Sequence, residues 1–515
     1  MSKPGGVTIE APLEVPLESS SESSSESPLE SPLESPNEAS FGDSLGDSLE
    51  KTAHLPSTMD ETEQLHHPSP APSPALILMV AGEASGDLHG GNLAREILAR
   101  HPQTRIFGIG GAKMQEAGVQ LLRSIDDLAV VGISEVLLQW KAIRQTFNTL
   151  GQFIRERRPD LVILIDYPDF NLRLAKVAKK ERIKVLYYIS PQVWAWRSWR
   201  IKTIARNVDT LLVVFPFEVP LYKDCGLDVR FIGHPLVDIV KSEFCGREEI
   251  CLKLGVDPKQ PIVGLLPGSR RSEIKRLLPQ LLGAATRIAQ AMPNVQFLLA
   301  LAPTIQLAEV EPYLQELEQE LEQEIEQEVD QELDQELEQE IDQEIDQEID
   351  QGLDQGLDQE RDQERDQEHK PSASAPAPAP VKILCRENST YDIIHVSDLV
   401  LVTSGTATLE TALLNAPMIL VYRLSLLSYA LGRLLIRVPY IGLVNLVAGK
   451  KIVPELIQYQ ASPEKIASLA LGILNDPKGQ ESMRSELRKI REKLGDPGSS
   501  ARAAEVVVEM LGKRS

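Results

Sequence analysis

A short polar turn in the last third of the sequence combines residue types that bind phosphate groups. Ser404, Gly405 and Thr406 follow the continuous apolar run 399–402, which has the composition of a parallel strand covered on both faces. We expect a tight turn into a helix, whose first amides and dipole would attract an anion. Glu410 lies one turn further along, where its carboxylate could accept hydrogen bonds from a ribose. The alternative is an ordinary Ser/Thr-capped crossover helix with Glu410 in solvent.

A second glycine turn lies earlier in the chain and adds positive charge. The strand-like run 262–266 leads into Gly268, Ser269, Arg270 and Arg271, and then into a predicted helix. The two arginines could neutralise a pyrophosphate held at the start of that helix. Two such turns close together predict a phosphate-binding half of the molecule.

Carboxylates follow a buried strand in the other half. Residues 161–165 are all apolar, and Asp166 and Asp169 come soon after them. Because the carboxyl ends of parallel strands face the edge where α/β proteins bind ligands, both are candidates for acid/base work. For Asp169 a helix cap is the favoured interpretation, and Asp166 could also simply stabilise its loop.

A glycine-rich loop after the apolar run 75–80 opens the predicted folded part of the chain. Backbone amides and carboxylates of this loop would lie at the same sheet edge as Asp166. The residues that we assign to it are Glu83, Ser85, Gly86 and Asp87, with His89 a further candidate base.

Two other segments carry weaker signals. Gly108 and Gly110 resemble a dinucleotide fingerprint only in part, because Lys113 occupies the place of the third glycine, so we do not expect NAD. Residues 190–200 hold three of the four tryptophans, interleaved with arginine. These rings could stack on a sugar or a base, or pack a domain edge, and composition does not separate the two.

The alternation of strands and helices indicates an α/β fold with two Rossmann-like halves. We expect a disordered Ser/Glu/Pro-rich tail at 1–74, an amino-terminal domain at 75–240, a carboxy-terminal domain at 241–305 and 381–495, an acidic repeat insertion at 306–380 and a carboxy-terminal helix at 496–515.

The insertion consists of four-residue units such as DQEI and EQEL. Apolar residues every fourth place advance about 40° per repeat around a helix, so they form no fixed seam, and carboxylates four apart repel each other. We therefore expect the chain to leave the fold from Gln315 to Gln367, and the fold to tolerate loss of about residues 311–375.

The net charge of −23 is unevenly distributed. About 26 acidic and 3 basic side chains lie in 311–370, and about 14 and 2 in 1–70, which leaves about +12 for the remainder. A basic folded body suits phosphorylated substrates or an anionic membrane surface, and nucleic acid fits the charge equally well.

Neither the cysteines nor the apolar runs suggest an extracellular or membrane-spanning protein. The four cysteines show no CxxC spacing, which argues against a zinc ribbon or a disulfide scaffold and favours a reducing cytoplasm. No apolar run approaches the roughly 18 residues of a membrane span, so we expect a soluble or peripheral protein. Residues 424–441 are apolar but interrupted by Arg433 and Arg437, as in an interfacial helix, although a core helix is slightly favoured.

The chain also contains six motifs in a fixed order: VAGEASGDLHGG (80–91), IDYPDFNL (165–172), SPQVWAWR (190–197), LLPGSRRSEI (265–274), TSGTATLE (403–410) and NLVAGKKIVPEL (445–456). Together they resemble the lipid-A-disaccharide synthase family over about residues 75–305 and 381–512. The resemblance implies a glycosyltransferase of the B type, in which an acceptor-side domain and a nucleotide-sugar-binding domain face a cleft. The tail and the insertion depart from the family pattern.

The resemblance implies a reaction that joins UDP-2,3-diacylglucosamine to 2,3-diacylglucosamine 1-phosphate, giving the β-1,6-linked lipid A disaccharide and UDP with inversion. Asp166 matches the family's proposed base, and Arg270 matches an arginine needed near the diphosphate. The positions expected to bind UDP are Gly268, Ser269, Ser404, Gly405, Thr406, Glu410 and Asn445. The acceptor-side loop is expected to comprise Glu83, Ser85, Gly86 and Asp87.

The same resemblance sets the expected partners. We expect no cofactor and no metal, because the folded body has no Asp-x-Asp pair and helix amino termini with Arg270 could take the cation's role. The expected partners are the acylated donor, the acylated acceptor and the cytoplasmic face of the inner membrane, without nucleic acid, and the oligomeric state is left open. The alternatives are another UDP-sugar transferase of the murein-precursor type and a non-catalytic protein that binds nucleotide sugars or lipids.

Overall fold

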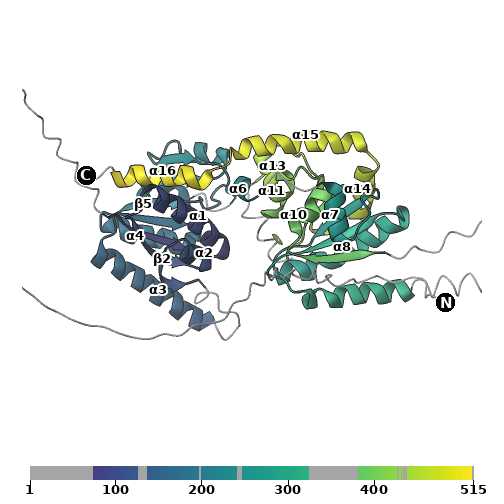
Figure 1. Cartoon of the computed structure of the whole chain (residues 1–515), viewed down its shortest axis with the longest axis horizontal. Coiled ribbons are helices and arrows are strands. Elements are labelled where there is room, and N and C mark those ends of the chain that lie inside the picture. Colours follow the sequence, from purple (N-terminus) through teal and green to yellow (C-terminus); the bar gives the residue numbers. More distant parts are fainter. Residues whose placement is uncertain are drawn as a thin grey trace, which may run out of the picture. The chain divides into compact units, whose positions relative to one another are not determined.

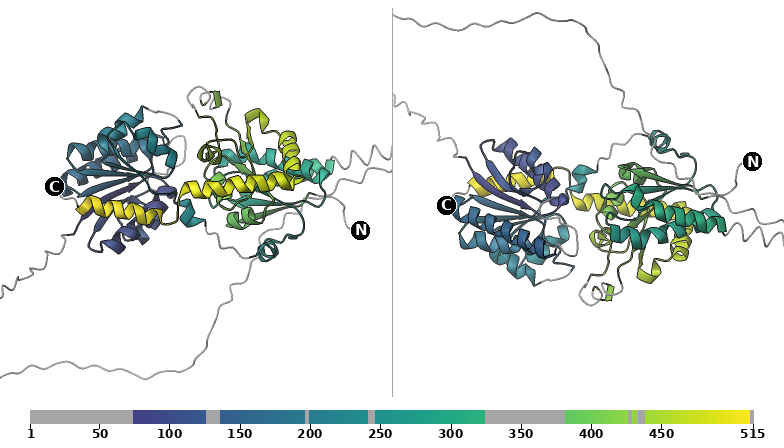
Figure 2. Two further views of the ribbon diagram at one scale, coloured as in Figure 1. Left: turned by 90° about the horizontal axis from the view of Figure 1, so that it is seen from above. Right: turned by 90° about the horizontal axis from the view of Figure 1, so that it is seen from below.

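The computed structural model describes residues 74–125, 136–195, 199–240, 246–323, 381–425, 429–430, 432 and 438–512. Its strands form one sheet of seven strands and one of six, and all the pairings between them are parallel. Helices cover the sheets, as Figures 1 and 2 show. This is the α/β arrangement that alternating strands and helices predict.

The first sheet has the order β3-β2-β1-β4-β5-β6-β7. Its strands are β1 (Leu76–Ala81), β2 (Arg105–Gly110), β3 (Gln120–Ser124), β4 (Leu161–Ile165), β5 (Lys184–Tyr188), β6 (Thr210–Val213) and β7 (Asp228–Phe231). The segments between and after them form α1 (Ala84–Arg100), α2 (Ala112–Glu116), α3 (Val136–Arg157), α4 (Pro168–Lys180), α5 (Arg200–Asn207), the 3-10 helix η2 (Pro216–Tyr222) and α6 (Leu236–Ile239).

Strand β1 shows why this sheet must be covered on both faces. Its side chains alternate between two cores: Ile77 and Met79 belong to one hydrophobic cluster, and Leu78 and Val80 belong to another. All four are buried. Because successive side chains of a strand point to opposite faces, a continuous apolar strand is stable only between two layers of helices.

The second sheet has the order β10-β9-β8-β11-β12-β13. Its strands are β8 (Ile262–Leu266), β9 (Gln296–Leu301), β10 (Ile383–Glu387), β11 (Leu399–Thr403), β12 (Met418–Tyr422) and β13 (Glu455–Ile457). Its helices are α7 (Arg247–Leu254), α8 (Arg271–Ala291), α10 (Thr390–Val396), α11 (Ala407–Leu413), α13 (Leu443–Ala448), α14 (Pro463–Leu474) and α15 (Pro477–Leu494), with 3-10 turns η3 (Leu307–Glu309) and η4 (Gln458–Gln460).

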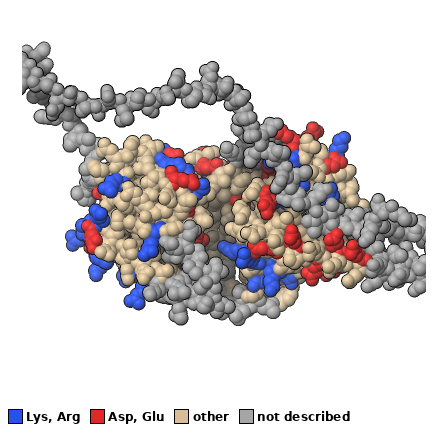
Figure 3. All heavy atoms as spheres, turned by 60° about the horizontal axis from the view of Figure 1, so that its bottom comes forward, with Lys and Arg blue, Asp and Glu red and all other residues tan. Residues whose placement is uncertain are grey.

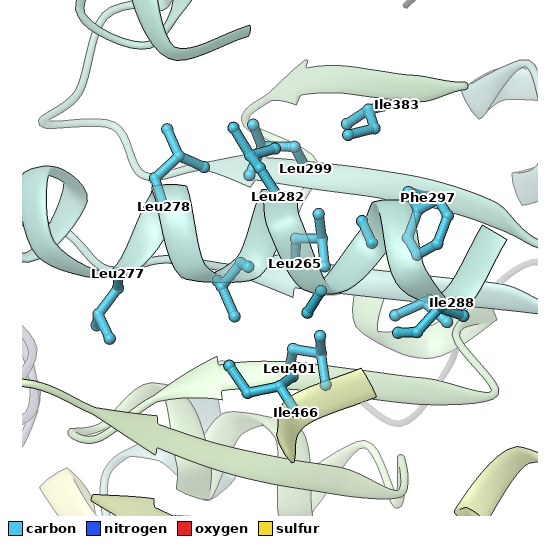
Figure 4. Close-up of a cluster of buried hydrophobic side chains, with 14 of the residues drawn as sticks. Leu265, Leu277, Leu278, Leu282, Ile288, Phe297, Leu299, Ile383, Leu401 and Ile466 are labelled. Carbon is cyan, nitrogen blue, oxygen red and sulfur yellow. The ribbon is translucent and has the colours of Figure 1, made fainter. Parts of the chain in front are cut away.

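Helix α8 anchors one face of the second sheet. Figure 4 shows its side chains, among them Leu278, Leu282 and Ile288, in one cluster with residues of the strands such as Leu265 and Phe297. All five are buried. Burying a leucine of this kind stabilises the fold by about 1.5–3 kcal/mol, so α8 holds the turn at its amino terminus firmly against the sheet.

The last two helices pack on different sheets. Leu487, Ile490 and Leu494 of α15 belong to a core cluster with strand residues of the second sheet. Helix α16 (Ser499–Gly512) instead lies along α1, and its Ala503 and Val507 belong to a core cluster with strands of the first sheet (Figures 1 and 2). The end of the chain therefore returns to the sheet in which the folded part begins.

The expected departure of the chain from the fold at Gln315 is wrong for the first turns of the acidic insertion. A helix begins at residue 311, and its described part runs to residue 323. Val310, Leu314 and Leu317 are buried in the core of the second sheet. Their spacing of four and then three residues keeps them on one side of a helix, which the strict four-residue repeat does not. A deletion from residue 311 would remove part of the core.

Several expectations fall on residues outside the described ranges. These are the disordered tail up to residue 73, the insertion from 324 to 380, and Arg433 and Arg437 in the predicted interfacial helix. Among the helices that the structure does describe, none combines the length and the hydropathy required to cross a bilayer.

Candidate active site

A pocket of about 820 Å³ opens at the carboxyl ends of four neighbouring strands of the second sheet, β10, β9, β8 and β11. This is the edge where parallel α/β sheets bind ligands. The predicted turn residues that line the pocket are Gly268, Ser269, Arg270, Ser404, Gly405, Thr406 and Glu410. The structure therefore brings the two glycine turns, more than 130 positions apart in the sequence, to one site.

The turn after β11 depends on glycine. Gly405 has a φ of +144°, a conformation that residues with a side chain rarely adopt, and its carbonyl oxygen accepts hydrogen bonds from the backbone and the hydroxyl of Thr408. No heavy atom lies within 4 Å of the position that a Cβ would occupy at Gly405. The backbone at this point is thus open to close approach by a ligand.

Thr403 is a pocket residue that the sequence reasoning missed. It ends β11 and is buried, and its hydroxyl has no hydrogen-bond partner among the described residues. A buried polar group without a partner costs stability, so a ligand that bonded this hydroxyl would remove a penalty. The available signal was a hydroxyl residue directly after four apolar strand positions.

The turn after β8 is arranged differently from the expected pyrophosphate cradle. The Glu273 carboxylate accepts hydrogen bonds from the backbone N–H groups of Ser269 (3.0 Å) and Arg270 (3.3 Å). These amides are therefore already occupied by an internal carboxylate. The Arg270 guanidinium pairs with the same carboxylate at 3.1 Å but is highly exposed, so solvent weakens that pair and the side chain can turn toward another anion.

Glu410 faces the pocket and does not extend freely into solvent, so that alternative is wrong. It is partly buried, and its carboxylate accepts a hydrogen bond from the Tyr391 hydroxyl at 3.2 Å. Burial raises the pKa of Glu410, and the bond from Tyr391 opposes that shift. Tyr391, which also lines the pocket, was not predicted from the sequence.

Asn445, whose contact with a nucleotide stays a prediction, is engaged in hydrogen bonds within the protein. It is fully buried and is not among the residues that line the pocket. Its amide nitrogen donates to the Val453 carbonyl and the Glu455 carboxylate, and its amide oxygen accepts from the N–H groups of Ile452 and Val453. With its hydrogen bonds committed in this way, Asn445 serves to hold the segment before β13 in place.

In the first sheet, Asp166 directly follows β4 in a left-handed conformation, with a φ of +44°. Two buried donors hold its carbonyl oxygen: the Asn171 side-chain amide at 2.8 Å and the Tyr187 hydroxyl at 2.6 Å. A left-handed aspartate is uncommon and persists only where its surroundings hold it. These bonds fix the backbone from which the carboxylate projects.

The electrostatics of Asp166 suit a general base. The pKa of its carboxyl is raised from 3.8 to about 6, first by burial and then by the negative charge of Glu83, while a hydrogen bond from the Tyr167 backbone opposes the shift. A carboxylate with a pKa near 6 is ionised at neutral pH and is a stronger base than a free one. Glu83 thus acts on Asp166 through its charge.

The other residues of the glycine loop differ in their exposure and in their contacts with the rest of the protein. Ser85 is exposed, and Gly86 is buried against Ala81 of β1. The Asp87 carboxylate accepts hydrogen bonds from the backbone N–H groups of Gly111 (2.6 Å), Lys113 (3.0 Å) and Met114 (3.0 Å). Asp87 therefore caps the start of α2, and its expected place in the acceptor-side loop stays a prediction.

Asp169 is not a helix cap, contrary to our expectation. The cap position of α4 is Tyr167, which makes no side-chain cap bond, and the carboxylate of Asp169 forms an ion pair with Arg200. Arg200 is buried and begins α5. Asp169 thus ties α4 to α5.

A buried carboxyl group that the sequence reasoning missed lies behind the tryptophan segment. Glu218 is 1% exposed and accepts a hydrogen bond from the Phe215 backbone at 3.1 Å, and burial raises its pKa to about 8. Trp194 packs edge-on against Phe217, while Trp199 is 65% exposed. The packing interpretation therefore holds for Trp194, and the motif's Trp196 and Arg197 lie outside the described residues.

Comparison with known proteins decides the family. A model described as "Lipid-A-disaccharide synthetase" matches residues 77–338 and 362–509. The lipid-A-disaccharide synthase of Geobacter sulfurreducens is 43% identical over 438 residues, which cover 85% of this chain and 98% of that protein. The chain belongs to the lipid-A-disaccharide synthase family. The same enzyme of Nitrosococcus oceani is 41% identical over 439 residues, with 85% and 97% covered.

Membership of the lipid-A-disaccharide synthase family makes the chain a glycosyltransferase, and its two Rossmann-like α/β halves are those of the B-type fold, as the sequence predicted. A solved structure of S. aureus MnaA with UDP has the same fold, with a TM-score of 0.50 and 10% identity over 86% of this chain and 99% of that one.

Proposed function

We propose that this glycosyltransferase transfers 2,3-diacylglucosamine from UDP to 2,3-diacylglucosamine 1-phosphate, giving the β-1,6-linked disaccharide 1-phosphate and UDP with inversion. Family membership supports the substrates. The observation that carries the mechanism is the ionisable carboxylate of Asp166 at the carboxyl edge of the first sheet, projecting from a backbone whose carbonyl oxygen is held by two buried donors.

In the proposed step, the Asp166 carboxylate takes the proton of the acceptor's primary hydroxyl group. The hydroxyl oxygen forms a bond to the anomeric carbon of the donor while the bond from that carbon to the diphosphate oxygen breaks. The proton ends on Asp166, and the electron pair of the broken bond leaves with UDP. Attack from the face opposite the leaving group inverts the anomeric centre.

On the donor side, we propose that the diphosphate lies at the Ser404–Thr406 turn and is neutralised by Arg270. The exposed guanidinium can exchange its Glu273 partner for phosphate, which forms stronger charge-assisted hydrogen bonds. We propose that this binding needs no divalent metal. Among the described residues, no group of three or more His, Cys, Asp or Glu side chains could hold one.

Two measurements test this function. Released UDP should be detected only when both acylated sugars are supplied, whereas a non-catalytic binding protein would release none, and a transferase of another specificity would need a different acceptor. Calorimetry with UDP should show the same affinity with and without EDTA, and loss of binding on chelation would remove the metal-free part of the proposal.

We further propose that the enzyme works at the cytoplasmic surface of the inner membrane, because both substrates carry acyl chains. On the face shown in Figure 3, Lys and Arg side chains form several small groups, some of which adjoin Asp and Glu. Electrostatic attachment to anionic vesicles should weaken with salt, whereas inserted apolar side chains should resist it. Sedimentation with such vesicles across a salt series tests this, and no binding at low salt would contradict it.

A further inference from the structure

The hydrogen bond between Tyr391 and Glu410 joins two helices at the lining of the pocket in the second sheet. Tyr391 lies in α10, which follows β10, and Glu410 lies in α11, which follows β11. Both residues line the pocket and are partly buried, and the hydroxyl and Glu410 Oε1 are 3.2 Å apart. Through this contact, Tyr391 of α10 restrains the Glu410 side chain of α11.

The roles of the two groups in this bond are clear. Burial raises the pKa of Tyr391, and the negative charge of Glu410 raises it further, so the phenol keeps its proton and donates. The Glu410 carboxylate accepts through Oε1. Its other oxygen, Oε2, has no hydrogen bond among the described residues and remains able to accept.

Glu410 is distinct from the other carboxylates that line the pocket, which are Glu273 and Asp392. Glu273 is bonded to the amides of Ser269 and Arg270, and Asp392 pairs with Lys253 at 2.7 Å. Within the described part of the pocket, Glu410 is therefore the carboxylate that an uncharged tyrosine restrains through one oxygen, whereas Asp392 is paired with the exposed cation of Lys253 and Glu273 holds the turn after β8. An acceptor held in this way selects a ligand with hydroxyl donors over one without them.

We propose that Tyr391 is a positioning residue that orients Glu410, so that the free carboxylate oxygen accepts hydrogen bonds from the ribose hydroxyls of the bound nucleotide and selects a ribonucleotide over a deoxyribonucleotide. The inference rests on the proposed binding of UDP in this pocket. Glu410 lies one helical turn beyond the Ser404–Thr406 turn, so a diphosphate at that turn places the adjoining ribose near the carboxylate. Loss of the Tyr391 hydroxyl would leave the carboxylate free to rotate and less selective.

The test compares Tyr391→Phe with the unmodified protein by calorimetry, with UDP, 2′-deoxy-UDP and 3′-deoxy-UDP as probes. The unmodified protein should bind UDP about tenfold more tightly than at least one deoxy analogue, since a hydrogen bond to a charged group is worth about that factor. Tyr391→Phe should lose most of this preference, because its affinity for UDP falls while its affinity for that analogue changes little. Glu410→Gln, which keeps the shape but removes the charge, should lose it too. Tyr459→Phe, at an exposed tyrosine outside the pocket, is the matched control.

The outcomes distinguish failure of the proposed UDP binding from failure of the positioning role of Tyr391. If the unmodified protein binds no UDP, the proposed function of the pocket is wrong. If it binds UDP but does not discriminate between the analogues, or if Tyr391→Phe keeps the preference, the positioning role is wrong. A thermal melt of each variant shows whether it is folded, and if Tyr391→Phe does not fold, unchanged discrimination in Glu410→Gln overturns the inference.

Discussion

The carboxyl edges of the two sheets have the same strand–turn–helix connections but carry different chemistry. At the first sheet, the turn after β4 presents a carboxylate whose pKa burial raises to about 6. At the second sheet, the turns after β8 and β11 present an exposed arginine, hydroxyl groups and open backbone. Burial and nearby charge, and not the topology, therefore decide whether such an edge is suited to proton transfer or to anion binding.

The backbone conformation also differs between the two edges. In the first sheet, Asp166 and Tyr167 adopt left-handed conformations although neither is a glycine, and Gly82 makes room for the Tyr167 ring, since a Cβ there would lie 2.3 Å from it. In the second sheet, Gly268 and Gly405 take the positive φ values. Surrounding contacts therefore hold the left-handed backbone at Asp166, whereas the turns at Gly268 and Gly405 adopt positive φ without the strain that a side chain would cause.

The largest effect should come from Asp166→Asn, which keeps the shape of the side chain and removes its basicity. Turnover should fall about a hundredfold or more while UDP affinity stays nearly unchanged. In the unmodified enzyme, kcat/KM should rise with pH and reach half of its plateau near pH 6, because Asp166 must be ionised to accept a proton. Near-normal turnover in the variant, measured as UDP release, would show that the first edge does not supply the base.

The same substitution should stabilise the protein at neutral and high pH. The pKa of Asp166 rises from 3.8 to about 6 on folding, so the folded state holds this proton more tightly than the unfolded state does. The contribution is present below pH 3.8 and is lost as the pH rises to about 6, which amounts to at most about 3 kcal/mol. Asn cannot ionise and avoids this loss. Denaturant unfolding at pH 4 and pH 8 should show the variant's advantage growing with pH, and a constant difference would argue against a raised pKa of Asp166 in the folded state.

At the second edge, Arg270→Ala should weaken UDP binding about tenfold, because one charge-assisted bond to the diphosphate is lost. The matched control is Arg271→Ala. Arg271 is equally exposed but pairs with Glu309 and does not line the pocket, so this change should alter affinity much less. Calorimetry with UDP decides between them. Equal losses of affinity in the two variants would show that Arg270 contributes only general positive charge and no specific contact.

The smallest effect on activity should come from Asp169→Asn, because Asp169 ties α4 to α5 and is not assigned a part in proton transfer. The ion pair with Arg200 is largely exposed on the Asp169 side, so its loss should cost about 1 kcal/mol of stability and little turnover. Parallel melts and rate measurements of the Asp166 and Asp169 variants test this contrast. A rate loss at Asp169 as large as that at Asp166 would spread the catalytic role over both carboxylates.

Local patterns in the sequence were sufficient to predict the fold class and the positions of the turns that carry Asp166 and Ser404–Thr406. The apolar runs at 161–165 and 399–402 became β4 and most of β11, because a continuous apolar strand is stable only inside a covered parallel sheet. Asp166 and the Ser404–Thr406 turn follow directly from where those strands end. The same local patterns misplaced the start of the acidic insertion, where Leu314 and Leu317 are buried.

The partners of each side chain were decided by the tertiary structure alone. Asp87 and Asn445 belong to family motifs, and the structure shows internal partners that the motifs do not reveal: Asp87 caps α2, and Asn445 holds the segment before β13. Tyr391 and Glu218 lie outside the six motifs, and Thr403 lies in one without having been assigned a role; all three acquire their environments from groups elsewhere in the sequence or from burial itself. Sequence spacing determines which strand end carries a residue. Hydrogen-bond geometry and desolvation depend on neighbours that only the folded chain brings together.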